Sequence, residues 1–397
     1  MVNLSETDKL ICILDPIDLD PLVEKIKPKS NKGPNGYSPE AILRAFLVQQ
    51  IEKIPSRADL VSKIDRSPYL RYVCGFSTTG RVPSESTFSR YYSKLSETDG
   101  LELLMNDLLD QSIELNLLDT EIMAIDASKL EAYERAKPRS KIDKKNSFTP
   151  DWGTKFDSHK NQITWFGWKI HAAVETKSEL PIALTLTPAN HADKTQAIPL
   201  VEKVDSFLAE RDLIEPKYWT MDSGYDTTDI YEHILFEQES QAIIPINKRN
   251  AKQPPAGFYD FKGTPVCSGG HKMYYWGHHN GVNKFRCPHV CGKVDCIHGT
   301  KWCSNSNYGR VTKTRPKENP RYISTPHRDS RTWRKIYNKR TSVERTFSRL
   351  KEHLNLENLT VMGAKKVKTH LLLSSISLIA ARIAAEKIKL QNQVLAA

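Results

Sequence analysis

The segment Tyr337-Asn-Lys-Arg-Thr-Ser-Val-Glu-Arg-Thr-Phe-Ser-Arg-Leu-Lys351 decides how the fold of the whole chain is interpreted. If it is a helix, Tyr337, Arg340, Glu344 and Lys351 fall on one face, because residues three, four and seven apart stack. An apolar stripe lies beside that face, formed by Val343, Phe347 and Leu350. A single carboxylate surrounded by basic side chains is the arrangement expected of an acid that binds a metal ion beside a chain of phosphates. A basic surface helix with one intrahelical ion pair explains this stretch equally well by itself.

Charge and composition narrow the range of partners. The chain has 397 residues, a formal net charge of +11 and ordinary apolar and charged contents of 39% and 26%. Such an excess of positive charge favours binding to a polyanionic partner, either nucleic acid or an anionic membrane. No apolar run reaches the ~20 residues of a spanning helix, because the longest candidate, 371–385, contains Arg382. The N-terminus also lacks the pattern of a signal peptide. We therefore expect a bacterial cytoplasmic protein with no membrane partner and with reduced cysteines.

Residues 1–118 are predicted to be all helical. Ser38 and Pro39 are typical of a helix start and precede apolar residues at helical spacing up to residue 51. Further helices are predicted over 57–65, from Ser84 onward, and over 97–118. This order fits a helix-turn-helix whose third helix presents Ser86 and Arg90 to DNA. Packing of three helices without any ligand is an equally common use of the pattern.

The pattern changes to strands from residue 121. Glu121–Ser128 alternates as a strand and places Asp126 before small residues. Two more strands are predicted over 163–174 and 181–187, joined by a turn at 177–178, after a basic link over 135–160 that shows no clear pattern. A helix over 197–211 then precedes a short buried strand that ends at Asp222. This order, with the first acid on the edge strand of three antiparallel strands, is typical of a ribonuclease H-like sheet in an α/β protein.

The two aspartates and Glu344 together indicate phosphodiester chemistry. Acids at the ends of neighbouring strands repel each other unless cations lie between them. Two divalent ions about 4 Å apart can activate an oxygen nucleophile and stabilise the charge on phosphorus and on the leaving oxygen. Carboxylate oxygens favour Mg²⁺ or Mn²⁺ over softer metals. Either aspartate alone is more simply explained as a cap of its turn, whereas the three acids in this context favour catalysis.

These motifs resemble those of the bacterial insertion-sequence DDE transposases, in the branch marked by Y-x2-R-x3-E-x6-K. Tyr337, Arg340, Glu344 and Lys351 match that signature at every spacing. The stretches Ala-Ile-Asp126-Ala-Ser and Met-Asp222-Ser-Gly-Tyr-Asp are similar to the first and second acid motifs, residues 180–193 resemble the stretch between them, and the N-terminal helices resemble the transposase N-terminal domain. The resemblance covers most of the chain.

The resemblance implies a ribonuclease H-like core that binds double-stranded DNA, namely the inverted-repeat ends of its own element and the target. It implies metal-dependent cleavage and strand transfer by Asp126, Asp222 and Glu344 with two Mg²⁺. It also implies DNA contacts from Tyr337, Arg340 and Lys351. The residues themselves extend that expectation, because 313–352 holds thirteen Lys or Arg against four acids. Arg345 and Arg349 are therefore predicted to contact phosphates as well.

Three nearby residues offer alternative assignments. Asp193 is a rival for the second acid, but it lies in a Pro-Ala-Asn-His loop, whereas Asp222 ends a strand. Asp226 is interpreted as the cap of a helix that starts at Thr227. His191 is either a supporting residue of the site or a loop residue satisfied by local hydrogen bonds.

The interval between Asp222 and Glu344 is longer than such a core needs, and an inserted ribbon is predicted over 251–312. Cysteine and histidine residues cluster there, which in a reduced compartment suggests a structural Zn²⁺ site in a β-rich ribbon. Thiols packed in a loop, or the remnant of an ancestral site, are the alternatives. Four zinc ligands are expected among Cys267, Cys287, Cys291, Cys296 and Cys303.

The predicted domains are a helical DNA-binding domain over 1–118, a ribonuclease H-like core over 119–250 and 313–397, and the cysteine-rich insertion between its parts. The last helix, over 365–389, is expected to pack on the sheet. The predicted function is that of a Mg²⁺-dependent DNA transposase that works as a homodimer on paired ends. A transposase-derived protein that binds DNA without cutting, and a ribonuclease H-like nuclease without strand transfer, are the alternatives.

Overall fold

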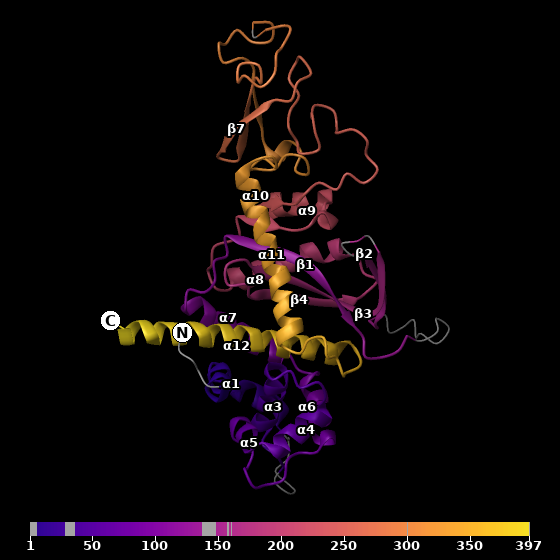
Figure 1. Cartoon of the computed structure of the whole chain (residues 1–397), viewed down its shortest axis with the longest axis vertical. Helices are drawn as coiled ribbons and strands as arrows, with labels where there is room; N and C mark the ends of the chain where they lie inside the picture. Colours follow the sequence, from indigo (N-terminus) through magenta and orange to yellow (C-terminus); the bar gives the residue numbers. More distant parts are fainter. Residues whose placement is uncertain are drawn as a thin grey trace.

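The computed structural model describes residues 6–27, 36–136, 148–156, 159, 161–299 and 301–396. The molecule is elongated, with a bundle of helices at one end, a mixed sheet in the middle and a small second sheet at the other end (Figure 1). The first seven helices are α1 (Glu6–Leu14), α2 (Asp20–Ile26), α3 (Pro39–Ile51), α4 (Arg57–Arg66), α5 (Pro68–Cys74), α6 (Glu85–Leu95) and α7 (Gly100–Glu114).

Serine caps start several of these helices. The side chains of Ser38, Ser56 and Ser67 accept hydrogen bonds from backbone N–H groups in the first turns of α3, α4 and α5. The predicted helices over 38–51, over 57–65 and from Ser84 are therefore confirmed, and α7 is shorter at both ends than the predicted 97–118. Helices α1, α2 and α5 were not predicted.

The central sheet has the strand order β2-β3-β1-β5-β6, with β4 also paired to β3. Strand β1 runs antiparallel to β3 and parallel to β5, and β5 runs parallel to β6. The strand that carries Asp126 is the last of the antiparallel strands, as predicted. Strand β5 pairs along its other side, so β1 is interior in the complete sheet. The strands are β1 (Ile122–Glu131), β2 (Asp151–Phe156), β3 (Gln162–Glu175), β4 (Pro181–Pro188), β5 (Tyr218–Thr220) and β6 (Gln241–Ile243).

Strand β2 corrects the expectation that 135–160 is a link without a pattern. It pairs with β3 from Asp151↔Gly167 to Phe156↔Gln162. Much of it is exposed, as suits an outer strand of the sheet, so it lacks the apolar alternation by which a half-buried strand is recognised. Residues 137–147 of the predicted link lie outside the described part of the chain.

One apolar core joins the helical end to the sheet. The last helix, α12 (Ala364–Ala396), begins after Gly363, whose φ of 85° suits glycine. It packs mainly against α7, α3 and α1 and makes fewer contacts with β4. The predicted packing on the sheet is therefore only a small part of what this helix does. Helix α8 (Ala197–Ala209) packs on β3 and β4. No helix in the described ranges is long and apolar enough to cross a membrane.

The insertion contains a second, antiparallel sheet of β7 (Tyr274–His279), β8 (Val282–Arg286) and β9 (Val311–Thr314). The buried Asn283 of β8 donates a hydrogen bond to the Ser324 carbonyl at 3.0 Å and so ties the sheet to the chain that follows it. Strand β9 straddles the predicted limit of the insertion at residue 312.

The segment 331–353 is helical throughout, but it is not one regular helix. Helix α10 (Arg331–Tyr337) passes through a 3-10 turn into α11 (Thr341–Ser348), which ends in a wider π turn over Arg349–His353. The Thr341 hydroxyl donates to the Asn338 carbonyl at 3.0 Å within the tight turn. The single straight face predicted for the four signature residues is therefore distorted at both ends.

Candidate active site

The register of β1 and β5 places two aspartates next to each other. Ala124 pairs with Thr220 in the parallel ladder, and Asp126 and Asp222 each follow two residues later. Parallel strands point the same way, so both carboxylates emerge from the same region of the sheet. The predicted adjacency of these two strands is thereby confirmed, although β1 continues to Glu131 instead of ending at Asp126.

Asp126 is the most perturbed acid of this group. Its side chain is 20% exposed, its Oδ1 accepts the Ala127 N–H at 2.8 Å, and its Oδ2 accepts Arg340 Nη1 at 3.0 Å. The pKa of Asp126 is raised to about 7, chiefly by burial and in addition by the charges of Asp222 and Glu344, against the opposing effects of the Ala127 N–H and Arg340. The three carboxylates therefore act on one another electrostatically.

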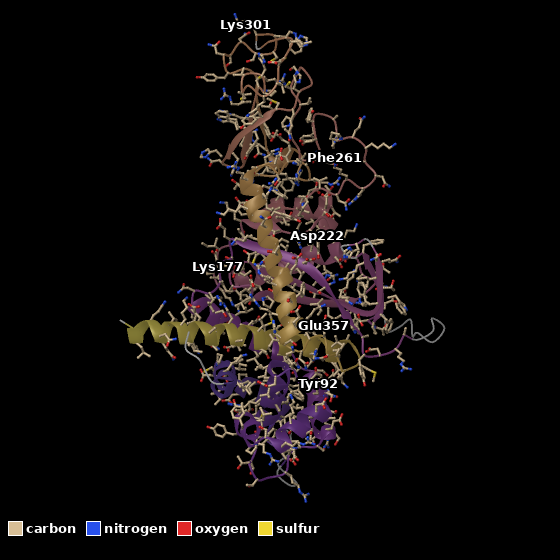
Figure 2. The ribbon with its side chains drawn as sticks, viewed as in Figure 1. Tyr92, Lys177, Asp222, Phe261, Lys301 and Glu357 are labelled. Atoms are coloured by element: carbon tan, nitrogen blue, oxygen red, sulfur yellow. The ribbon has the colours of Figure 1, made fainter. Side chains whose placement is uncertain are left out.

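Asp222 ends β5 and turns the chain into a short 3-10 turn. Its Oδ1 accepts the N–H of Gly224 at 2.7 Å. A Cβ at position 224 would stand 2.9 Å from the same oxygen, so a larger residue would crowd the carboxylate. The local sequence thus orients the second acid through its own turn. Asp222 lies in the middle of the elongated molecule (Figure 2).

Arg340 connects the first and third acids. Glu344 lies on α11 with 51% of its side chain exposed, and its Oε1 accepts Arg340 Nη2 at 2.7 Å. The same guanidinium contacts Asp126. The intrahelical ion pair of the alternative interpretation is present, but Arg340 also bonds a carboxylate 214 residues away in the sequence, which a lone surface helix would not do.

The chemistry of this cluster fits a divalent cation. The oxygens of three acids are hard ligands, and a cation among them would favour the ionised form of Asp126. The hydroxyl of Tyr225 is buried beside the two aspartates and has no hydrogen-bond partner in the described residues. Arg340 contributes one positive charge, which it shares between Asp126 and Glu344. Within the described ranges, no three His, Cys, Asp or Glu side chains stand close enough together to hold a metal ion.

Several bases predicted to contact phosphate have partners inside the protein. Arg345 Nε and Arg349 Nη2 each lie 2.5 Å from a carboxylate oxygen of Glu179. The side chain of Glu179 is only 12% exposed. Lys351 is 13% exposed, and its Nζ donates to the Lys129 carbonyl at 2.7 Å. These bases hold the helical segment against the sheet. Glu179 was not predicted, because no helical or strand spacing links it to these bases.

The remaining predicted DNA contacts lie in two places. The ring of Tyr337 stacks on Trp333 with 5.0 Å between ring centroids, beside the 3-10 turn that carries Arg340. Ser86 and Arg90 are exposed on α6, in the helical end of the molecule marked by Tyr92 in Figure 2. The structure does not bring those two residues to the acids.

Asp226 has a different role from the predicted helix cap. Its side chain is fully buried and accepts Arg321 Nε at 3.1 Å, Arg321 Nη2 at 2.7 Å and the Asn247 N–H at 2.8 Å. Thr227 is the residue at the N-cap of the next helix, α9 (Thr228–Glu232). The prediction is wrong because the carboxylate is needed to neutralise a distant arginine, for which the sequence contains no local signal.

The loop between the two strand acids has its own ion pair. Asp193, the rival second acid, contacts Lys169 Nζ at 2.8 Å, and the carbonyl of His191 accepts from the same lysine at 2.8 Å. Asp222 follows β5, which pairs directly with β1, whereas Asp193 lies in a 3-10 turn after β4. The geometry favours Asp222 as the partner of Asp126.

The cysteine cluster of the insertion surrounds a small cavity. The backbone N–H of His271 lies 3.4 Å from Cys267 Sγ, and that of Cys296 lies 3.3 Å from His289 Nδ1. Cys291 does not line the cavity. The ligand-type residues that do line it are Cys267, His271, Cys287, His289, Cys296 and Cys303.

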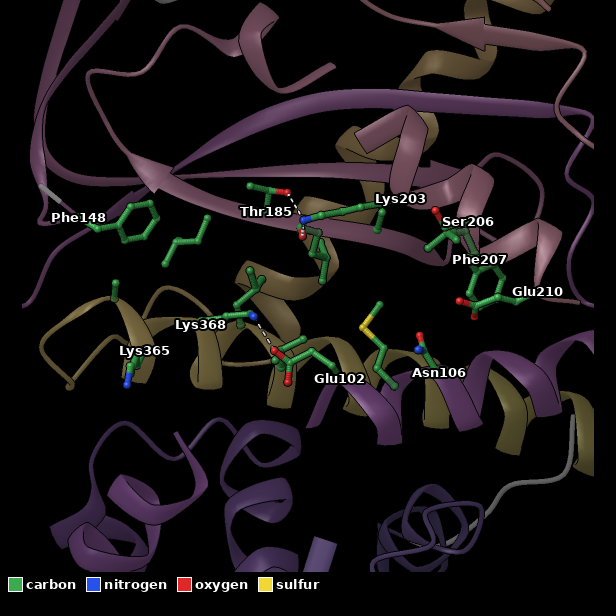
Figure 3. Close-up of a pocket in the computed structure, with 18 residues that line it drawn as sticks. Glu102, Asn106, Phe148, Thr185, Lys203, Ser206, Phe207, Glu210, Lys365 and Lys368 are labelled. Carbon is green, nitrogen blue, oxygen red and sulfur yellow. Dashed lines mark hydrogen bonds and ion pairs between the residues drawn. The ribbon is translucent and has the colours of Figure 1, made fainter. Parts of the chain in front are cut away.

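A larger hollow of about 670 Å³ lies elsewhere, among β4, α7, α8 and α12 (Figure 3). Lys203 enters it and donates to Thr185 Oγ1 at 2.9 Å, while Lys368 and Glu102 form an ion pair at 2.5 Å. Burial lowers the pKa of Lys203, with a further contribution from the charge of Lys368. None of the three acids lines this hollow, so we assign it no part in the site.

Comparison with known proteins gives two family matches. Residues 118–380 match a family described as the transposase DDE domain, and residues 3–94 match one described as a transposase domain (DUF772). No curated protein matches the chain. A cryo-EM structure of the piggyBac transposase synaptic complex with hairpin DNA is similar to it, with 13% identity and a TM-score of 0.43, over 98% of this chain and 77% of that chain.

Proposed function

Since the chain belongs to the transposase DDE domain family, we propose that it cleaves the ends of its own DNA element and joins them to a target with Asp126, Asp222 and Glu344. The observation that carries the proposal is the shared position of these acids. The β1–β5 register sets the two aspartates side by side, and Arg340 links Asp126 to Glu344.

The central sheet supports a ribonuclease H-like core. Strands β1, β3 and β4, helix α8 and strand β5 follow one another in the order expected from the sequence, and β2 and β6 extend the sheet at its two sides. We assign the core to residues 119–250 and 313–397, the helical DNA-binding domain to 1–118 and the insertion to 251–312. The partners are double-stranded DNA, at the terminal repeats and the target, and a second copy of the chain.

The residues of the site have distinct tasks in this proposal. Mg²⁺ or Mn²⁺, when bound, supplies Lewis-acid stabilisation of charge on the phosphate oxygens. Asp126 offers ligands from the middle of β1, Asp222 from the turn just after β5, and Glu344 from a helix with an exposed side chain. Arg340, at 17% exposure, can pass from the carboxylates to a phosphate because its guanidinium suits either anion bidentately.

The test uses DNA that carries the sequences flanking the gene, placed on a linear duplex, with scrambled ends as the control. We expect cleavage at the element ends only with Mg²⁺ or Mn²⁺, and joined products when target DNA is added. Cleavage without joined products would support the nuclease alternative. Specific binding to the ends without cleavage under either metal would support the non-catalytic alternative.

We further propose that the cavity cysteines hold a structural Zn²⁺, which needs about four ligands. Mass spectrometry of the purified chain is expected to find close to one zinc per protein, and Cys267→Ser or Cys296→Ser is expected to lower that ratio, because each removes a thiolate from the cavity. Cys291→Ser is the matched control, since Cys291 does not line it. Less than about half an equivalent in the wild-type chain would rule the site out.

A further inference from the structure

The outer face of the small β7-β8-β9 sheet carries only basic charge. Side chains alternate across a strand, so Lys284 and Arg286 share one face of β8, while Asn283 and Phe285 are buried on the other. Lys284 pairs with Lys313 of β9. Neither Lys284 nor Lys313 has a carboxylate partner in the described part of the chain. The face is an unneutralised cationic surface.

Exposed aromatic rings are interleaved with these cations. The guanidinium carbon of Arg286 lies 4.2 Å from the ring centroid of Trp276 and 5.3 Å from that of Tyr308. Trp276 is 53% exposed and Tyr308 is 67% exposed. The ring of Tyr274 stands 6.4 Å from that of Trp276, and Lys293 Nζ lies 5.3 Å from the Tyr274 centroid. Rings and cations thus follow one another along the surface.

A depression of about 430 Å³ lies beside this row of rings and is lined in part by Trp276, Lys284, Lys313 and Arg315. That volume falls within the range of small-ligand sites, about 300–1,000 Å³. Gly277 contributes to the lining, and a Cβ there would meet no atom within 4 Å. The depression is open to a flat group that approaches the sheet.

We propose that this face binds an unpaired DNA strand, with bases stacked on Trp276 and Tyr308 and phosphates on Lys284, Arg286 and Lys313. The proposal rests on the transposase function and specifies a form of DNA that the protein holds. Cations alone would suffice for the backbone of a duplex, whose base faces are hidden, whereas exposed rings between cations suit single strands. A protein partner fits less well, because lysine is depleted at protein interfaces.

The face lies at the opposite end of the molecule from the helices that carry Ser86 and Arg90, with Asp222 between the two ends (Figure 2). A duplex held by the helical end and a strand held by the small sheet would therefore be on either side of the acids. Cleavage at the acids breaks the backbone of a strand and creates an end, from which a strand that unpairs could reach the small sheet.

The experiment measures fluorescence anisotropy of a labelled oligothymidine and of a mixed-sequence duplex of equal length with the full chain, without added divalent cation or chelator. Trp276→Ala is expected to weaken oligothymidine binding about tenfold, within the range for loss of one base-stacking ring, and to leave duplex binding within about twofold. Trp152→Ala is the matched control, because Trp152 is similarly exposed at 55% but lies on β2 of the central sheet. Lys284→Ala with Lys313→Ala should reduce the salt dependence of oligothymidine binding.

The proposal is overturned if Trp276→Ala binds oligothymidine as tightly as the wild type, or if the variant loses duplex and single-strand binding equally. Thermal unfolding of each variant excludes misfolding, and Trp276→Phe, which keeps a ring, should restore most of the affinity. Binding here requires neither cation nor catalytic acid. If the chain cleaves DNA but Trp276→Ala has no effect on oligothymidine binding, this proposal fails and the catalytic one stands. If the chain does not cleave DNA but Trp276→Ala weakens that binding as expected, the catalytic proposal fails and this one stands.

Discussion

Glu344→Gln is expected to reduce metal-dependent cleavage of the element ends by on the order of a thousandfold or more, and Asp126→Asn and Asp222→Asn are expected to do the same. Each change removes a charged oxygen ligand of the cation. Stabilisation of the transition state by that cation is worth several kcal/mol, and each 1.36 kcal/mol of activation free energy changes the rate about tenfold. The measurement is single-turnover cleavage of the flanking-end duplex in Mg²⁺ and in Mn²⁺.

The controls for these variants separate chemistry from folding. Glu344 is half exposed, so glutamine should leave the thermal midpoint and DNA binding nearly unchanged. Glu352→Gln is the matched control, since it removes an exposed acid from the π turn that follows α11. Asp126→Asn should not destabilise the metal-free chain, because burial and two neighbouring acids already disfavour its charge. Cleavage at the wild-type rate by either Glu344→Gln or Asp222→Asn would exclude the assignment.

The parts of this site that follow from local sequence were predictable. Helical spacing places Arg340 one turn before Glu344, and the observed ion pair has that i, i+4 separation. Strand patterning followed by small residues identified Asp126 and Asp222. The bond from Arg340 to Asp126 was not predictable, because it joins residues 214 positions apart whose proximity depends on how the helical segment crosses the sheet.

The same limit applies to the fold. Caps such as Ser38 mark helix starts from nearby residues alone, and α3 begins as predicted. The interior position of β1 depends on the pairing of Ala124 with Thr220, which a single strand pattern does not contain. The pairs of Glu179 with Arg345 and Arg349 are also non-local. They leave fewer bases available to DNA than the count of lysines and arginines suggests.

Arg321→Met is expected to destabilise the chain by about 3 kcal/mol, because it leaves the carboxylate of Asp226 buried without its charged partner. Two Arg321 nitrogens bond that carboxylate, and the Asn247 N–H that also bonds it carries no compensating charge. Urea unfolding followed by circular dichroism measures the change. Arg315→Met is the matched control, since its pair with Glu318 is exposed and 3.6 Å long, and such pairs contribute about 0–1 kcal/mol.

The double variant Asp226→Asn with Arg321→Met makes the cause explicit. The double variant removes the buried carboxylate charge that Arg321→Met leaves unpaired. It should therefore be more stable than Arg321→Met alone. Equal stability of the two variants would show that lost packing of the arginine, rather than an unpaired carboxylate, accounts for the effect. The pair also has a consequence for the site, because Asp226 follows the 3-10 turn that orients Asp222. Loosening that turn in Arg321→Met should slow cleavage even where the chain stays folded.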